Sequence, residues 1–95
     1  MANDQNREEK ASKLTELVEG MFDSFGIKVR VEAVNFEEDG IVLEISIAMG
    51  VRIEDVEALS KTLALVVASP TGKVEIVAPI SGKSLIGIKI PNSSV

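Results

Sequence analysis

The spacing of apolar residues near the N-terminus predicts a helix. Apolar side chains recur three and four positions apart from Leu14 to Phe25, which places them on one helical stripe. The stripe consists of Leu14, Leu17, Val18, Met21, Phe22 and Phe25. Gly26 is expected to end the helix. Because so many large side chains share one face, we expect this helix to pack against a sheet.

Residues 27–48 have the pattern of two strands joined by a tight turn. Ile27, Val29, Val31 and Ala33 alternate with charged residues, as in a strand with one solvated face. A turn is expected at residues 37–40, where Gly40 can adopt the positive φ of a hairpin. The second strand is expected to place on its core face Ile41, Leu43, Ile45 and Ile47.

Helical spacing returns in the second half of the chain and is followed by two more strands. Residues 53–68 form the second predicted helix, with Glu54 and Asp55 in the first turn, where the helix dipole favours anions. Residues 73–80 predict a third strand, and Pro79 places that strand at an edge or at its own end. Residues 85–90 predict a fourth strand, with its inward residues Ile86, Ile88 and Ile90.

The order helix, strand, strand, helix, strand, strand predicts an α+β fold. We expect a two-layer sandwich in which the helices cover one face of a four-stranded sheet. Residues 1–13 are polar and are expected to form a flexible N-terminal segment. The folded domain is then expected to span residues 14–92, with a C-terminal tail at 93–95.

The composition excludes much enzyme chemistry. The 95 residues include no cysteine and no histidine, which excludes a disulfide framework, a cysteine nucleophile and a histidine base. A net charge of −5 disfavours a free-standing nucleic-acid binder, and three phenylalanines without tryptophan or tyrosine leave few stacking platforms. No apolar run reaches the roughly 20 residues of a membrane span. We therefore expect a soluble, cytoplasmic domain without catalytic residues, metal or cofactor.

Two short motifs have an ordinary structural interpretation. Gly82-Lys83-Ser84 is similar to part of a nucleotide-binding loop, but Val77 stands where that loop requires its first glycine, and a strand pattern follows instead of a helix. A hairpin turn is therefore the favoured interpretation. The carboxylates of residues 37–39 lack the ligand spacing of a calcium loop and indicate a solvated turn.

Several exposed positions are candidates for contacts with partners. Basic residues on predicted strands or turns are candidates for DNA-phosphate contact: Arg30, Lys73, Lys83 and Lys89. Glu32, Glu44 and Glu75 are expected on the same face, and such mixed charge is also typical of an ordinary soluble surface. Apolar residues expected off the core face indicate a subunit or domain contact: Val34, Val42, Val77 and Leu85.

The C-terminal stretch carries a specific set of motifs. It contains Ala78-Pro79-Ile80-Ser81-Gly82-Lys83, then a strand with Gly87 at its centre, and a closing Pro91-Asn92. This stretch resembles the end of the α domain of the FtsK and SpoIIIE double-stranded DNA translocases. Gly50-Val51-Arg52-Ile53 and Phe25-Gly26-Ile27 are also similar to that family, so the resemblance covers about residues 14–92. The hairpin departs from the family pattern, and in its second strand only Glu44 keeps its identity.

The resemblance implies a non-catalytic part of a motor. In that family the α domain contributes to a hexameric ring and to the coupling of ATP-driven movement of duplex DNA, in chromosome segregation and cell division. ATP and Mg²⁺ would bind in a following ATPase domain of RecA type, and the parent protein can be membrane-anchored. The implied partners are that domain, other copies of this chain and, weakly, duplex DNA. The alternative is a stand-alone nucleic-acid- or protein-binding α+β module.

Overall fold

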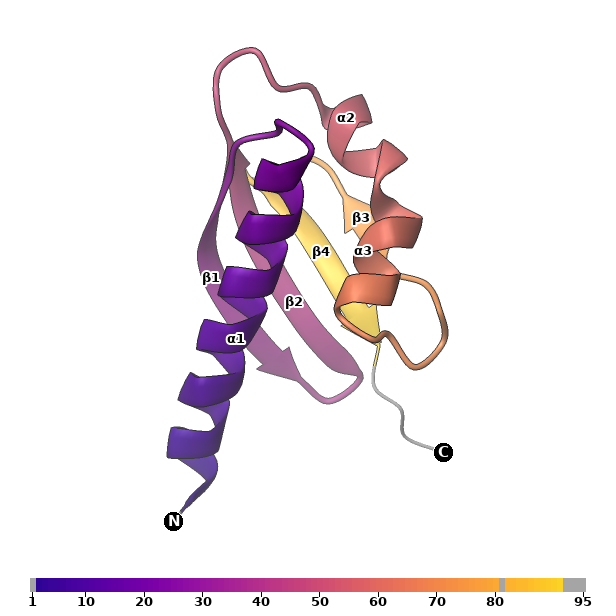
Figure 1. The fold of residues 1–95 in the computed structure, drawn as a ribbon. Coiled ribbons are helices and arrows are strands. Elements are labelled where there is room, and N and C mark those ends of the chain that lie inside the picture. Colours follow the sequence, from indigo (N-terminus) through magenta and orange to yellow (C-terminus); the bar gives the residue numbers. More distant parts are fainter. Residues whose placement is uncertain (1, 81, 92–95) are drawn as a thin grey trace.

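Helices cover one face of a four-stranded antiparallel sheet in the computed structural model, which describes residues 2–80 and 82–91 (Figure 1). The elements are α1 (Ala2–Ser24), β1 (Val29–Glu37), β2 (Gly40–Ile47), α2 (Ile53–Ala58), α3 (Ser60–Val66), β3 (Glu75–Val77) and β4 (Ile86–Pro91). The predicted α+β sandwich and its element order are confirmed. Ser81, Asn92 and the predicted tail at 93–95 lie outside the described residues.

The strand order in the sheet is β1-β2-β4-β3, and every neighbouring pair is antiparallel. The C-terminal strand β4 therefore lies between β2 and β3, which run in the same direction. Segment α2–α3 connects these two strands across the sheet, while α1 lies over β1 and β2 (Figure 1). β3 forms an edge, as Pro79 predicts, but it is only 3 residues long.

The core lies between the helices and the inner face of the sheet. The buried side chains of α1 are Leu14, Val18, Met21 and Phe22, and those of β2 and β4 are Ile41, Leu43, Ile45, Ile86, Ile88 and Ile90. Val56 of α2 and Leu63 of α3 are completely buried and complete the core. Burying one such side chain contributes about 1.5–3 kcal/mol. The predicted core faces of the second and fourth strands are confirmed.

The first helix begins earlier than predicted and buries only part of its predicted stripe. It begins at Ala2, so it includes most of the segment 1–13, whose flexibility stays a prediction. The guanidinium of Arg7 lies 5.5 Å from the ring centroid of Phe36 on β1, which gives this half of the helix a contact with the sheet. The predicted stripe is only partly buried, because Leu17 is 44% and Phe25 is 55% exposed. Gly26, at φ +77°, follows the helix end.

A β-bulge in β1 changes which side chains face the core. The register against β2 shifts between Val31 and Ala33, so β1 carries an extra residue there. The extra residue reverses the alternation, and Val34 and Phe36 pack against the core. The prediction that Val34 lies off the core face is therefore wrong. The hairpin loop itself contains only residues 38–39, because Glu37 pairs with Gly40.

The predicted helix 53–68 is divided into two short helices. Leu59 separates α2 from α3 with φ −100° and ψ 13°, outside the α-helical range. No proline or glycine occurs between Ile53 and Val66, so no local signal for this break exists in the sequence. Val56 and Leu63, on either side of the break, both reach the core.

Candidate interaction surface

The face of the sheet opposite the helices, here called the outer face, bears most of the predicted contact residues. No helix of the described residues covers this face (Figure 1). Lys89 is exposed on β4, between Val42 of β2 and Glu75 of β3 in the strand register. Arg30 is exposed on β1, opposite Ser46. The structure therefore places Arg30 and Lys89 on one face, at different positions along the sheet.

Lys83 reaches the outer face from the loop between β3 and β4 and pairs with a glutamate. Its Nζ lies 3.1 Å from Oε1 of Glu44, and the side chains are 51% and 15% exposed. The second oxygen of Glu44 accepts a hydrogen bond of 2.9 Å from Nδ2 of Asn35. Ion pairs at a protein surface contribute about 0.2–1 kcal/mol, so Lys83 is held weakly. The candidate phosphate contact at Lys83 is thus occupied by a carboxylate.

The loop that carries Lys83 folds back over the outer face. A Cβ added at Gly87 would lie 3.3 Å from Cγ1 of Ile80, so the absence of a side chain at 87 lets Ile80 pack closely on β4. The amide of Ile80 donates to the carbonyl of Leu85 at 2.8 Å, and the amide of Lys83 donates to the carbonyl of Ile80 at 2.9 Å. The Ala78-Pro79-Ile80 motif and Gly87 therefore have a joint structural role, which sequence reasoning missed.

The charges of the outer face are mixed. Glu32 accepts a hydrogen bond of 2.7 Å from the hydroxyl of Ser46, and Glu75 lies opposite Lys89 in the register. Lys73 is separate from the others, because it lines a pocket of about 440 Å³ with Ser60 and Lys61 beside α3. The four candidate basic residues therefore do not form a single patch. Their contact with DNA stays a prediction.

Three apolar candidates remain on the outer face, on β2, on β3 and just before β4. Val77 is 38% exposed, while Val42 and Leu85 are half-buried. Val77 also lies beside Gly87, since an added Cβ there would be 3.7 Å from the Cβ of Val77. Ile80 thus covers part of the surface that the sequence assigned to a partner. The predicted subunit or domain contact at these residues stays a prediction.

The described residues contain no cluster of acidic side chains arranged to hold a metal ion. Gly82 and Lys83 lie in a loop followed by strand β4, so the helix that a nucleotide-binding loop requires is absent from this place. The pocket between Asp39, Glu75 and Lys89 has a volume of about 130 Å³, smaller than the roughly 300 Å³ of small ligand sites. None of the helices within 2–80 and 82–91 is long and apolar enough to cross a membrane.

Comparison with known proteins identifies the family. The family model described as FtsK alpha domain matches residues 1–92. The chain is 42% identical over 93 residues to a protein named DNA translocase FtsK from Streptococcus pneumoniae, covering 97% of this chain and 12% of that protein. Proteins of the same name from Streptococcus pyogenes and Lactococcus lactis are 39% and 38% identical, each over 98% of this chain and 11% and 12% of their own length.

These relatives bear on the domain boundaries in two ways. The match begins at residue 1, so it includes the first half of α1 as well as the domain predicted from residue 14. The chain spans about 12% of the length of the first relative, so that protein contains much more than this domain. The resemblance seen in the C-terminal motifs is confirmed: the chain belongs to the FtsK alpha domain family.

Proposed function

We propose that this chain is the non-catalytic alpha domain of an FtsK-like hexameric DNA translocase. In this role it contributes to ring assembly and couples ATP-driven movement of duplex DNA, in chromosome segregation and cell division. The observation that carries the proposal is the family match over residues 1–92, together with relatives named DNA translocase FtsK of which this chain spans a small part. An alpha domain alone cannot drive movement, so its role depends on a larger protein.

The chemistry of the chain supports a non-catalytic role. It has no histidine or cysteine, and no metal-binding cluster occurs among the described residues. We therefore assign ATP and Mg²⁺ to a neighbouring ATPase domain of RecA type in the same protein. Energy from ATP then has to reach this domain through contacts between folded parts, which requires exposed surface on both partners.

The outer face supplies such a surface. It carries Val77, which is 38% exposed, and half-buried Val42 and Leu85. A ring requires head-to-tail contacts, in which each copy uses a different surface for each of its two neighbours. We assign one of these contacts to the outer face. Arg30 and Lys89 on the same face would give weak, salt-dependent contacts with DNA phosphates.

The test uses two variants of the complete protein encoded by the gene. One carries an aspartate on the sheet of this domain, and the other carries an aspartate on its helical layer. Val77→Asp introduces a charge on the outer face, and Leu65→Asp, at a position 80% exposed on α3, is the matched control. Electron microscopy of protein on duplex DNA should show fewer closed rings for Val77→Asp and unchanged rings for Leu65→Asp. Equal ring formation by both variants would remove the outer face from the assembly contact. A complete protein without an ATPase domain would overturn the translocase assignment itself.

A further inference from the structure

The pairing of Lys83 with Glu44 suggests a contact that can change partner. We propose that Glu44 holds Lys83 in the absence of DNA and releases it to a phosphate of duplex DNA, so that Glu44 limits DNA binding by this domain. The inference rests on the proposed function, which makes duplex DNA the available polyanion. It goes further, because it assigns a regulating role to a glutamate beside the basic residue.

Glu44 can lose Lys83 without being left unpaired. Its two carboxylate oxygens have separate partners: Oε1 pairs with Lys83 and Oε2 accepts from Asn35. The side chain is 15% exposed, so a carboxylate without any partner here would be poorly solvated. Asn35 lies on β1, within the same hairpin, and remains bonded when the lysine moves. Release of Lys83 therefore leaves the hairpin intact.

Lys83 can move without a rearrangement of its loop. Ile80 packs on Gly87, and two backbone hydrogen bonds, Ile80 N to Leu85 O and Lys83 N to Ile80 O, hold the described residues on either side of the lysine. The side chain is 51% exposed, and Gly82 and Ser84 on either side are also exposed. A lysine has a flexible stem with a compact charge at its end. The ammonium group can therefore exchange a carboxylate for a phosphate while the loop stays in place.

Competition between Glu44 and a DNA phosphate for Lys83 should change the DNA affinity by a measurable amount. A surface ion pair is weak and is screened by salt, and each phosphate contact by a lysine is also salt-dependent. If Lys83 must leave Glu44 before it binds DNA, then removing the carboxylate charge raises the affinity for DNA. The strength of a surface pair corresponds to an increase of about 1.4- to fivefold.

The experiment measures binding of the 95-residue chain to a fluorescently labelled duplex by anisotropy at low ionic strength. Glu44→Gln should bind about 1.4- to fivefold more tightly than the wild type, and Lys83→Met more weakly. Glu32→Gln is the matched control, because it removes the same charge from the same face at a residue bonded to the hydroxyl of Ser46. In the Lys83→Met background, Glu44→Gln should raise the DNA affinity no more than Glu32→Gln does. Circular dichroism verifies that each variant is folded.

The opposite outcomes are distinct. If Glu44→Gln and Glu32→Gln raise the DNA affinity equally, the effect is one of general charge and the exchange is overturned. The same conclusion follows if Glu44→Gln raises the affinity fully in the Lys83→Met background. Absence of DNA binding by both the wild type and Glu44→Gln would also overturn it. A larger effect with a single strand of the same length would reassign the partner from duplex to single-stranded nucleic acid. None of these results affects ring formation by the complete protein, which tests the proposed function separately.

Discussion

The carboxylate of Glu19 accepts a hydrogen bond from the backbone amide of Val31, with 2.8 Å between Oε2 and N. Glu19 belongs to α1 and Val31 to β1, which is an edge strand of the sheet. The bond gives an acceptor to an amide of this edge strand, immediately before the β-bulge. Edge amides left open are sites of pairing with other chains, so Glu19 both anchors the helix and protects this edge.

Replacement of Glu19 tests this role. Glu19→Ala should lower the free energy of unfolding by about 1 kcal/mol, since the Val31 amide loses its acceptor. Glu19→Gln keeps a side-chain oxygen at the same place, so its free energy of unfolding should fall by less. Urea denaturation measures both variants, and sedimentation velocity shows whether the opened edge promotes self-association. If Glu19→Ala is as stable and as monomeric as Glu19→Gln, the bond has no protective role.

Two glycines should respond to alanine in opposite directions. A Cβ at Gly40 would lie 2.2 Å from the backbone oxygen of Ile90, so Gly40→Ala forces β2 away from β4. We expect a loss of about 1–3 kcal/mol or more. Gly20, in α1, has no other atom within 4 Å of an added Cβ, and Gly20→Ala should add about 1 kcal/mol through helix propensity. Thermal unfolding of both variants measures the difference, and a stable Gly40→Ala variant would contradict the close β2–β4 approach.

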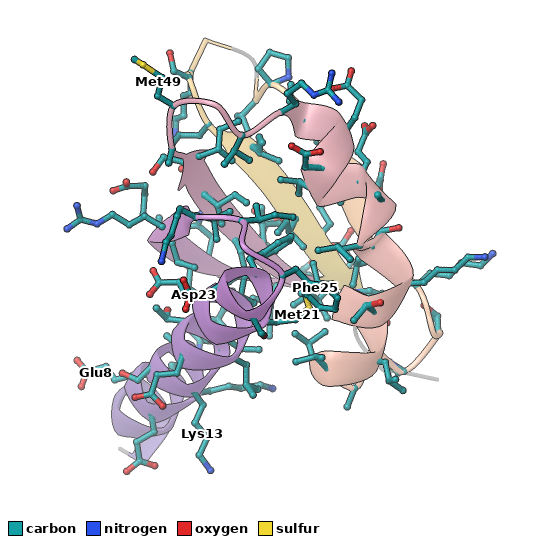
Figure 2. All side chains as sticks on the ribbon, turned by 45° about the horizontal axis from the view of Figure 1, so that its top comes forward. Glu8, Lys13, Met21, Asp23, Phe25 and Met49 are labelled. Carbon is teal, nitrogen blue, oxygen red and sulfur yellow. The ribbon has the colours of Figure 1, made fainter. Side chains whose placement is uncertain are left out.

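Two phenylalanines close together in the sequence provide a test of the core. Phe22 is completely buried, whereas Phe25 is 55% exposed and, in Figure 2, lies on the side of α1 that faces α3. Phe22→Ala should lower the free energy of unfolding by about 3–5 kcal/mol through the cavity it leaves. Phe25→Ala should change it by about 0.5 kcal/mol. Denaturant titration compares them, and equal losses would show that the helix packs through a different face.

The chain should hydrolyse no ATP. Strand β4 follows Gly82 and Lys83 where a nucleotide-binding loop requires a helix, and Lys83 is paired with Glu44. Phosphate release in the presence of ATP, Mg²⁺ and duplex DNA should therefore equal that of a protein-free control. Turnover that persists through repeated purification and disappears in Lys83→Met would contradict the non-catalytic assignment.

The sequence predicted regular elements better than local irregularities. Alternation in β2 and β4 was sufficient to predict their buried residues, because both are inner strands of the sheet and the extra residue of the bulge lies in β1. The bulge after Val31 could not be predicted, since Glu32 and Ala33 carry no turn signal, and Val34 was consequently assigned to the wrong face. The break at Leu59 has the same explanation.

At the candidate site, the sequence pattern also could not predict which residues far apart in the chain come into contact. Lys83 was identified as a basic residue in a turn, but its distance in sequence from Glu44 concealed the pair between them. The strand order brings these residues together, because β4 lies beside β2, and the alternation of apolar and polar residues does not specify which strands are neighbours.

The coupling role of this domain is tested by comparing the complete protein with a form that lacks residues 1–92. Displacement of a third strand from duplex DNA measures translocation, and phosphate release in the same reaction measures ATP use. The account predicts that the shortened protein still hydrolyses ATP but moves far fewer base pairs for each ATP consumed. Equal movement per ATP with and without residues 1–92 would contradict a role of this domain in coupling.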